Sequence, residues 1–389
     1  MSGNSSEVVP VLSLAVLGRS RKENERRLPL HPDHLRRIPE PVRARLHLES
    51  GYGEGFGYSD TDLAGLVAGV APREQLIDGC DVVLLPKPVL QDVRELRPGQ
   101  VLWGWPHCVQ DSELTQAAID RGLTLIAFEA MNHWDADGSF NLHVFHKNNE
   151  LAGYCSVLHA LQLVGRTGHF GRRLRAVVIG FGATARGAVT ALNGLGVTEV
   201  DVLTRRETAA VAAPIHTVRM VHLEGGPERE SSRAVVEEQS LDIAEFLSDH
   251  DLIVNCVLQD PKAPMMFLAE SDLPALAPGV LVVDVSCDTG MGFPWARPTT
   301  FTEPMFEVVP GVHHYGVDHS PSHLWQAATW ENSEALLPFL GPVLAGPDGW
   351  DANPTIARAI EIREGVVQNP EILAFQRRAA DHPHPVLAG

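Results

Sequence analysis

Three residue types that could act together on a carbonyl group each follow an apolar stretch of the sequence. Lys87 interrupts DVVLLPKPVL, His107 lies near the end of LWGWPHC, and Glu129 lies near the end of LIAFEA. An ammonium group can polarise a carbonyl oxygen, an imidazole exchanges protons near neutral pH, and a carboxylate adjusts the charge of both. We therefore predict a catalytic set of Lys87, His107 and Glu129.

Position along the chain favours chemistry over a purely structural role for these residues. A single strand-end lysine is commonly a surface charge, and a single histidine is commonly part of a core. The three apolar stretches read as neighbouring parallel strands, however, and α/β sheets bind ligands at the carboxyl ends of their strands. Only four of the 31 lysine and arginine residues are lysines, which favours a specific need for an ammonium at Lys87. Cys108 follows His107 directly, so we expect its thiol to face the opposite side.

A second chemical motif lies in VVIGFGATARGA. Gly180 ends an apolar strand, Gly182 follows in a tight turn, and Ala185 takes the third position of a GxGxx(G/A) pattern that opens a helix. These small residues permit the turn, let backbone approach a pyrophosphate, and keep helix and strand close. The motif predicts dinucleotide binding. The alternative is an ordinary strand-to-helix turn.

The end of the next strand, in EVDVLTRRE, indicates which dinucleotide is bound. Sites for NAD usually have an acidic residue there, about 20 residues after the glycines. This chain has Thr204, Arg205 and Arg206 instead. A hydroxyl and two guanidinium groups can bind a ribose phosphate that an acid would repel, so we predict NADP(H) rather than NAD(H). The alternative is that both arginines lie on a solvated turn.

The elements that must position these residues form two α/β blocks. Strand and helix patterns alternate from LSLAVLG to LTLIAFE and again, after the long helix NNELAGYCSVLHALQLVG, from RAVVIGFG to GVLVVDVS. The fold class is therefore α/β, with two Rossmann-like doubly wound parallel-sheet domains and a cleft between them. We predict a discontinuous substrate and catalytic domain of residues 1–148 plus 322–389, and a dinucleotide-binding Rossmann domain of residues 149–321. The helices SHLWQAATWENSEALLPFLGPVL and ANPTIARAIEIREGVV are expected to pack on the first block.

Composition narrows the choice of partners. A chain of 389 residues with a formal net charge of -18 would repel nucleic acid and anionic membranes. No apolar run approaches the roughly 20 residues that span a bilayer, so we expect a cytoplasmic protein with small-molecule ligands. The five cysteines are scattered singly, so we expect neither disulfides nor a zinc site. We predict no metal at the histidine cluster of His313, His314, His319 and His323, because Pro321 interrupts the helix that would align the last two.

The start of the chain carries a family resemblance. RKENERRLPLHPDHL resembles the N-terminal motif of the alanine dehydrogenase and transhydrogenase family, in which a Glu-x-Arg binds a substrate carboxylate. The resemblance gives that role to Glu25 and Arg27. LLPKP and WGWPHC are similar to the family's active-site lysine and histidine segments, and the likeness continues to RPTTF, over most of the chain.

Other stretches resemble particular subgroups of this family. EAMNHWDADGSFNLHVFHKNNELAGY, FGATARGA and VLTRRE are like the carboxyethyl-ornithine synthase-like subgroup. VVDVSCDTG and VDHSPSH are similar to the lysine-forming saccharopine dehydrogenases, and His319 stands where alanine dehydrogenases usually have asparagine. The resemblance implies that Asp288, with Asp318 or His319, lines the nicotinamide end of the cofactor site. HKNNE is expected either to contact nicotinamide or substrate, or to cap a helix through Asn148.

The resemblance implies a reductive condensation that uses NADPH. The substrates would be an amino acid amine and a pyruvate-like 2-keto acid, and the product an opine-type dicarboxylic secondary amine; the reverse oxidation is equally open. Two alternatives are an alanine dehydrogenase-like reductive amination with free ammonia, and a non-catalytic NADP-binding sensor or scaffold. Family analogy also makes a homo-oligomer plausible.

Overall fold

A computed structural model describes residues 11–205, 217–226, 228–259 and 263–387. The chain divides into two compact units, the first made of Met1–Phe145 with Trp325–Gly389 and the second of His146–Leu324. The domain boundaries predicted from the sequence lie three residues from each of these junctions. Which unit holds which ligand remains a prediction.

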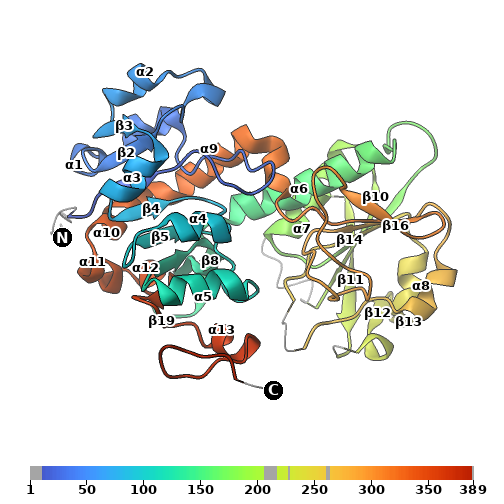
Figure 1. Cartoon of the computed structure of the whole chain (residues 1–389). Coiled ribbons are helices and arrows are strands. Elements are labelled where there is room, and N and C mark those ends of the chain that lie inside the picture. Colours follow the sequence, from blue (N-terminus) through green and yellow to red (C-terminus); the bar gives the residue numbers. More distant parts are fainter. Residues whose placement is uncertain (1–10, 206–216, 227, 260–262, 388–389) are drawn as a thin grey trace. The chain divides into compact units, whose positions relative to one another are not determined.

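The first unit is built on an eight-stranded sheet in the order β19-β18-β6-β5-β4-β1-β2-β3 (Figure 1). The six strands from the N-terminal segment run parallel, and β18 and β19 are added antiparallel at one edge. The chain order reverses between β1 and β4, so the loops after these two strands flank a switch point, where open α/β sheets bind ligands. The strands are β1 (Leu14–Val16), β2 (Leu46–Glu49), β3 (Gly69–Ala71), β4 (Val82–Leu84), β5 (Val101–Gly104), β6 (Thr124–Ala127), β18 (Ile360–Arg363) and β19 (Val366–Val367).

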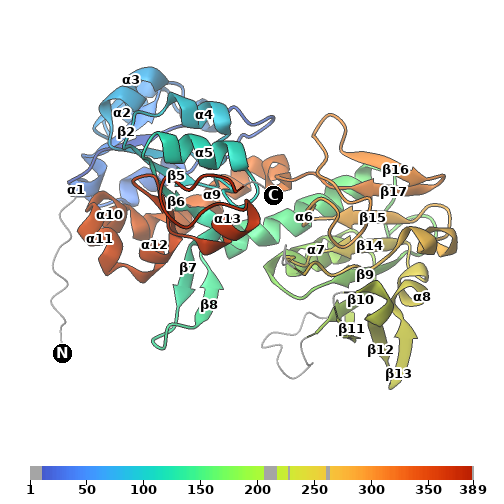
Figure 2. The same ribbon diagram turned by 60° about the horizontal axis from the view of Figure 1, so that its bottom comes forward.

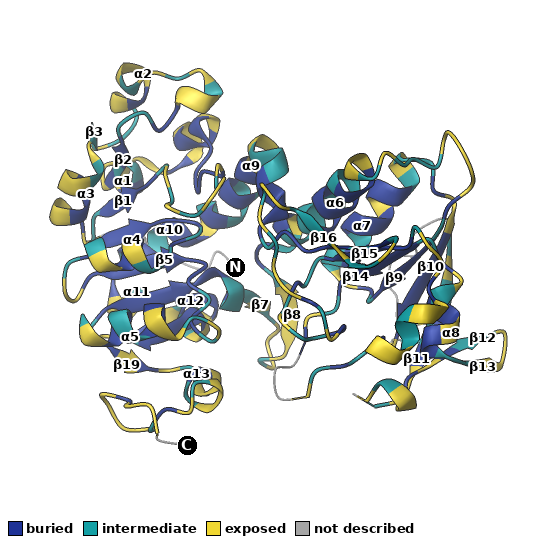
Figure 3. Ribbon diagram, turned by 45° about the vertical axis from the view of Figure 1, so that its right-hand side comes forward, coloured by how far each residue is buried: buried dark blue, intermediate teal, exposed yellow. Residues whose placement is uncertain are grey.

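Helices cover both faces of this sheet because its strands are apolar on both sides. In β4, Val82 and Leu84 enter one buried cluster, while Val83 enters the cluster on the opposite face. Figure 3 shows β5 buried and the outer surfaces of α4 and α5 exposed. The helices are η1 (Pro32–Arg37), α1 (Glu40–Arg43), η2 (Glu54–Phe56), α2 (Asp60–Ala64), α3 (Arg73–Gly79), α4 (Leu90–Glu95), α5 (Ser112–Asp120), η3 (Phe128–Ala130), α9 (Trp325–Leu336), η8 (Leu337–Phe339), α10 (Leu340–Leu344), α11 (Pro347–Ala352), α12 (Pro354–Ala359) and α13 (Pro370–Phe375).

Two features of this unit differ from the sequence expectation. A hairpin of β7 (Asn132–Trp134) and β8 (Phe140–His143) forms a separate small sheet, which stands away from the large sheet in Figure 2. The helix predicted over ANPTIARAIEIREGVV is wrong in its second half, because α12 ends at Ala359 and β18 follows at once. The alternating Ile-Glu-Ile of β18 fits a strand, and Glu364 and Gly365 both have positive φ, which produces the turn into β19.

The second unit has a nine-stranded sheet in the order β13-β12-β11-β10-β9-β14-β15-β17-β16. Six neighbouring strands run parallel, with antiparallel strands at both edges. With the first sheet, this confirms the predicted α/β class of two mostly parallel sheets. The elements are α6 (His146–Leu163), β9 (Arg175–Ile179), α7 (Ala183–Gly194), β10 (Glu199–Thr204), β11 (Val218–Glu224), η5 (Arg229–Ser231), β12 (Arg233–Val236), β13 (Gln239–Asp242), α8 (Ile243–Ser248), β14 (Leu252–Asn255), η6 (Glu270–Ala275), β15 (Leu281–Asp284), β16 (Met305–Val309), β17 (Val312–Tyr315) and η7 (Ser320–Leu324).

Helices α6 and α7 touch through their backbones. A Cβ placed on Gly187 would lie 1.7 Å from the carbonyl oxygen of Glu150, and one placed on Gly153 would lie 1.9 Å from that of Thr184. Only glycine therefore fits at either position. Asn148 does not cap α6 as one alternative proposed, because the helix already begins at His146. Across the described residues, no helix combines the length and apolar character needed to cross a membrane.

Candidate active site

Lys87 and His107 lie side by side at the carboxyl ends of β4 and β5. The Lys87 Nζ is 2.8 Å from the His107 Nε2. If the ammonium donates this hydrogen bond, Nε2 is the acceptor and the imidazole hydrogen is on Nδ1. His107 has a φ of 50°, a left-handed conformation that is uncommon outside glycine and often occurs at functional sites. Its side chain keeps 43% of its surface exposed, so the imidazole is accessible to a ligand.

A close backbone contact brings these two strand ends together. A Cβ on Gly104 would lie 2.0 Å from the carbonyl oxygen of Leu85, so only glycine fits at the end of β5. Just beyond it, the Trp105 amide donates a 2.8 Å hydrogen bond to the carbonyl oxygen of Pro86. Lys87 and His107 follow these contacts directly. The glycine in WGWPHC is the sequence signal for this approach, and it was not among the residues singled out from the sequence.

Glu129 lies in η3, after β6, and is bonded to the histidine. Its Oε1 accepts a 2.7 Å hydrogen bond from the main-chain N–H of His107 and is 3.8 Å from Nδ1. Burial, followed by the charge of the neighbouring Glu361, raises the pKa of Glu129 to about 8. The structure thus brings together all three residues of the predicted catalytic set. It also adds the charge of Glu361 from β18, a residue that was not predicted because its segment was expected to be helical.

Glu25 and Arg27 are bonded to each other after β1. The Glu25 Oε1 accepts hydrogen bonds of 2.9 Å from both the main-chain N–H and the Nε of Arg27, and a further bond joins Arg27 Nη2 to Glu25 Oε2. Both side chains are almost completely buried. The Arg27 guanidinium lies 5.1 Å above the ring of Trp105, which connects it to the end of β5. Arg27 is therefore arranged to hold a carboxylate in two-point contact, and here that carboxylate belongs to Glu25.

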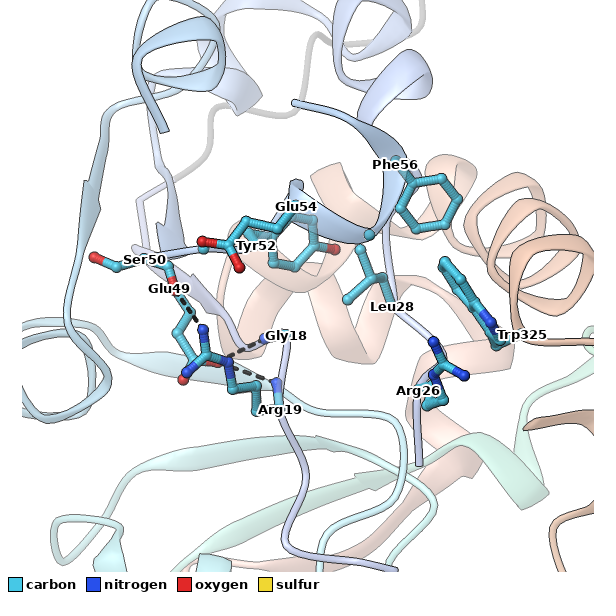
Figure 4. Close-up of a pocket in the computed structure, with 12 residues that line it drawn as sticks. Gly18, Arg19, Arg26, Leu28, Glu49, Ser50, Tyr52, Glu54, Phe56 and Trp325 are labelled. Atoms are coloured by element: carbon cyan, nitrogen blue, oxygen red, sulfur yellow. Dashed lines mark hydrogen bonds between the residues drawn. The ribbon is translucent and has the colours of Figure 1, made fainter. Parts of the chain in front are cut away.

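A pocket of about 410 Å³ is lined in part by the same segment (Figure 4). Arg26 and Leu28 from this segment line the pocket, whereas Glu25 and Arg27 do not. Glu49 holds the pocket-lining backbone of Gly18 and Arg19 in place, because its carboxylate accepts hydrogen bonds of 2.8 Å and 3.1 Å from their main-chain N–H groups. The residues that line it include none of the predicted catalytic set. The lining residues are Gly18, Arg19, Arg26, Leu28, Glu49, Ser50, Gly51, Tyr52, Glu54, Gly55, Phe56 and Trp325.

The glycine motif of the second unit has the geometry of a dinucleotide turn. Gly180 has a φ of 101°, and a Cβ there would lie 3.3 Å from the carbonyl oxygen of Cys256 at the end of β14. Gly182 precedes α7 as its N-cap, and apart from its chain neighbours no described atom lies within 4 Å of the point where its Cβ would be. Ala185 is fully buried. The first turn of α7 can therefore be approached closely by a phosphate, which helix N-termini bind.

The end of β10 carries the residues predicted to distinguish the two dinucleotides. Thr204 is buried as the last residue of the strand. Arg205 is exposed and donates a 2.8 Å hydrogen bond to the carbonyl oxygen of Gly225. Arg206 lies outside the described residues. The described part of this strand end therefore offers one hydroxyl group and one guanidinium group to a ribose phosphate.

The residues expected near the nicotinamide lie in the loops after β15 and β17. His319 is buried, its Nδ1 is bonded to an oxygen of Asp318, and its ring packs on Phe301 at 4.6 Å. Burial raises the pKa of Asp288 above its ordinary value. His314, on β17, is fully buried 3.9 Å from Asp284. The described part of the chain contains no group of three or more histidine, cysteine, aspartate or glutamate side chains placed to hold a metal ion.

Comparisons with known proteins agree with this two-unit arrangement. Two family models match, "Alanine dehydrogenase/PNT, N-terminal domain" over residues 17–151 and "Alanine dehydrogenase/PNT, C-terminal domain" over residues 166–370. The alanine dehydrogenase of Halomonas elongata is 29% identical over 350 residues, which are 85% of this chain and 86% of that protein. The N(5)-(carboxyethyl)ornithine synthase of Clostridium botulinum is 22% identical over 323 residues, 80% of this chain and 89% of that one.

A solved L-alanine dehydrogenase has the same fold. It superposes with a TM-score of 0.73 at 22% identity and covers 94% of this chain and 99% of its own. A transhydrogenase from Sinorhizobium meliloti superposes with a TM-score of 0.69 at 20% identity, over 92% of this chain and 99% of its own.

Proposed function

Because the chain belongs to the alanine dehydrogenase/PNT family, we propose that it joins an amino acid amine to a 2-keto acid with reducing equivalents from NADPH. The chain is an oxidoreductase that acts on CH–NH bonds with a nicotinamide cofactor. Beyond this activity, we propose that the amine comes from an amino acid, that it is joined to a 2-keto acid, and that the cofactor is NADPH rather than NADH. The non-catalytic alternative does not fit this family membership.

The contact between Lys87 and His107 is the observation that carries the proposal. The two side chains place an ammonium and an imidazole 2.8 Å apart, beside the carboxyl group of Glu129. The ammonium can donate to the ketone oxygen and so make the carbonyl carbon more electrophilic. The imidazole can take a proton from the attacking amine nitrogen and return it to the oxygen. One pair of side chains thus provides both functions needed to form a carbinolamine.

The remaining steps use the same groups. A second proton delivered to the hydroxyl oxygen releases water and leaves a carbon–nitrogen double bond. A bound reduced nicotinamide supplies the hydride that converts this carbon into that of a secondary amine. In our proposal Arg27 holds the carboxylate of the keto acid by two parallel hydrogen bonds, in the contact that Glu25 makes in this structure. Substrate binding would therefore exchange one carboxylate for another at Arg27.

We assign the cofactor as NADP(H) from the chemistry at the end of β10. Thr204 offers a hydroxyl and Arg205 a guanidinium, where an NAD site usually has an acid that would repel a ribose phosphate. The open turn at Gly182 supports binding of the pyrophosphate of either dinucleotide. The preference for the phosphorylated form therefore depends on Thr204 and Arg205 alone among the described residues.

Reductive amination with free ammonia is the second candidate, because several similar proteins are named alanine dehydrogenases. The predicted catalytic residues serve both reactions equally. The two differ only in whether a second amino acid is bound.

A substrate screen separates the two reactions. Purified full-length protein is mixed with NADPH and pyruvate, and then with either ammonia or single amino acids, while NADPH absorbance is followed. Oxidation that requires an amino acid, with a secondary amine identified by mass spectrometry, supports the proposal. Oxidation with ammonia alone supports the second candidate, and the Lys87→Ala protein controls for background oxidation. Parallel reactions with NADH test the cofactor assignment.

A further inference from the structure

Glu361 is a second buried carboxyl group, and its charge acts on Glu129. It belongs to β18 and is 4% exposed. Ile360 pairs with Ile126 and Ile362 pairs with Leu125, so Glu361 is the extra residue of a bulge between β18 and β6. Bulges redirect side chains and are common beside active sites. This one directs a carboxyl group inward, where Asn369 Nδ2 donates a 3.2 Å hydrogen bond to its Oε1.

Glu129 and Glu361 each have one carboxylate oxygen whose hydrogen-bonding capacity is unused. The Oε2 atoms of both residues are shielded from solvent and accept no hydrogen bond within the described structure. The Glu129 side chain as a whole keeps 26% of its surface exposed, so the shielding is specific to that oxygen. Two buried acceptors without a donor are costly, and two adjacent ionised carboxylates are costlier still. One proton placed between the two groups removes both penalties.

We propose that Glu129 and Glu361 form a carboxyl pair that shares one proton at neutral pH, and that Glu361 is a positioning residue for Glu129, His107 and Lys87. The shared proton joins the two Oε2 atoms. It leaves Oε1 of Glu129 to accept the main-chain N–H of His107. The sharing is independent of the proposed function, whereas its effect on turnover depends on that function.

Neighbouring charges agree with this assignment. Burial raises the pKa of Glu361, and burial together with the charge of Glu361 raises that of Glu129 to about 8. The other titratable groups that act on the pair are Glu371, which opposes ionisation, Lys87, which favours it, and the Cys108 thiol, which lies within hydrogen-bonding reach of the Glu361 carboxyl. The Cys108 thiol is buried and its own pKa is raised well above the ordinary value, so it can act only as a weak donor there.

The consequence for the site is a charge that changes near pH 8. Below that pH the pair carries one negative charge. Above it the shared proton is lost, and a second negative charge appears behind His107. Such a charge favours a proton on the imidazole and opposes its removal. Turnover of wild-type protein should therefore show an alkaline transition that belongs to the carboxyl pair.

Glu361→Gln is the decisive variant, because an amide can still donate to Oε2 of Glu129 but cannot share a proton. Infrared difference spectra of the full-length protein between pH 7 and pH 9 should contain the carbonyl band of a protonated carboxyl group in wild type and lose it in Glu361→Gln. Glu361→Asp should keep the band. Glu371→Gln, a matched change on exposed α13, should keep it too. Burial raises the pKa of Asp284 to about 7, so this carboxyl group also titrates in the range, but it contributes equally to every protein and cancels between variants.

The outcomes distinguish the two claims. Loss of the band in Glu361→Gln, with loss of the transition near pH 8 in kcat, supports the whole proposal. An unchanged band in Glu361→Gln overturns it. If Glu361→Gln does not fold, Glu129→Gln provides the same comparison from the other side of the pair. If the protein shows no turnover with any substrate, the proposed function has failed while the infrared result still decides the carboxyl pair. A band that disappears without any change in the kcat profile rejects the positioning role of Glu361.

Discussion

Replacing Gly187 with alanine should damage the cofactor turn through the contact between α6 and α7. The new Cβ would lie 1.7 Å from the Glu150 carbonyl oxygen, and about 1.3 Å of separation is needed to restore a 3.0 Å contact. Both partners are helical backbone, so no side chain can turn aside to make room. Overpacking typically costs about 1–3 kcal/mol, and alanine returns up to about 1 kcal/mol in helix propensity. We expect a net loss of up to about 2 kcal/mol in unfolding free energy.

The same displacement should weaken cofactor binding. Gly182 and the first turn of α7 are at one end of the helix, and Gly187 lies five residues further along. A shift of about 1 Å at the phosphate site would weaken hydrogen bonds that depend on close approach. We expect a tenfold increase in the dissociation constant for NADPH, which corresponds to about 1.4 kcal/mol of binding free energy. Isothermal titration of the full-length protein with NADPH measures this change, and urea unfolding followed by circular dichroism measures stability.

Gly194→Ala is the matched control on the same helix. Apart from its chain neighbours and the backbone of its own helix, no described atom lies within 4 Å of its added Cβ, so it should be neutral or stabilise by up to about 1 kcal/mol. NADPH affinity should not change. If Gly187→Ala matched this control in both stability and affinity, the backbone contact would not be what positions α7.

Three further variants test the site. Lys87→Ala and His107→Ala should each reduce turnover at least 100-fold with little change in NADPH affinity, since general acid–base groups typically contribute factors of about 10²–10⁴; near-normal rates would reject their roles. Arg205→Ala should raise the dissociation constant for NADPH about tenfold and leave that for NADH unchanged, and equal weakening of both would remove the case for a phosphate site. Burial raises the pKa of Asp284 to about 7, so the folded protein keeps a proton that the unfolded chain loses above about pH 4, and stability falls as pH rises towards 7. Asp284→Asn should therefore be up to about 4 kcal/mol more stable at pH 8 and little changed at pH 4 by urea unfolding; a pH-independent difference would contradict this.

Local patterns in the sequence were sufficient for the parts of the site built by consecutive residues. The turn from β9 into α7 follows from small residues at fixed spacing, and its geometry at Gly180 and Gly182 agrees with that reading. The strand-end rule placed Lys87 and His107 on neighbouring strands, and they are in contact. The bond between Glu25 and Arg27 was not foreseen, because the family resemblance concerned a substrate rather than a partner within the chain.

Contacts between segments that are far apart in the sequence could not be predicted from local sequence patterns. The charge of Glu361 acts on Glu129 only because β18 pairs with β6, more than 200 residues earlier in the sequence. The segment Ile-Glu-Ile is too short for its alternation to outweigh the helical pattern before it. The bulge that directs Glu361 inward depends on that pairing as well, so no local signal could have identified it.

The position of β18 also affects how the protein is made on the ribosome. Strand β6 is complete by residue 127, but its neighbour β18 begins at residue 360, after the whole second unit has been translated. At about 5–20 residues per second, the apolar edge of β6 waits on the order of 10–50 s for its partner. During that interval it is an open sheet edge of the kind that aggregates or recruits chaperones, whereas the continuous second unit can fold as soon as it emerges.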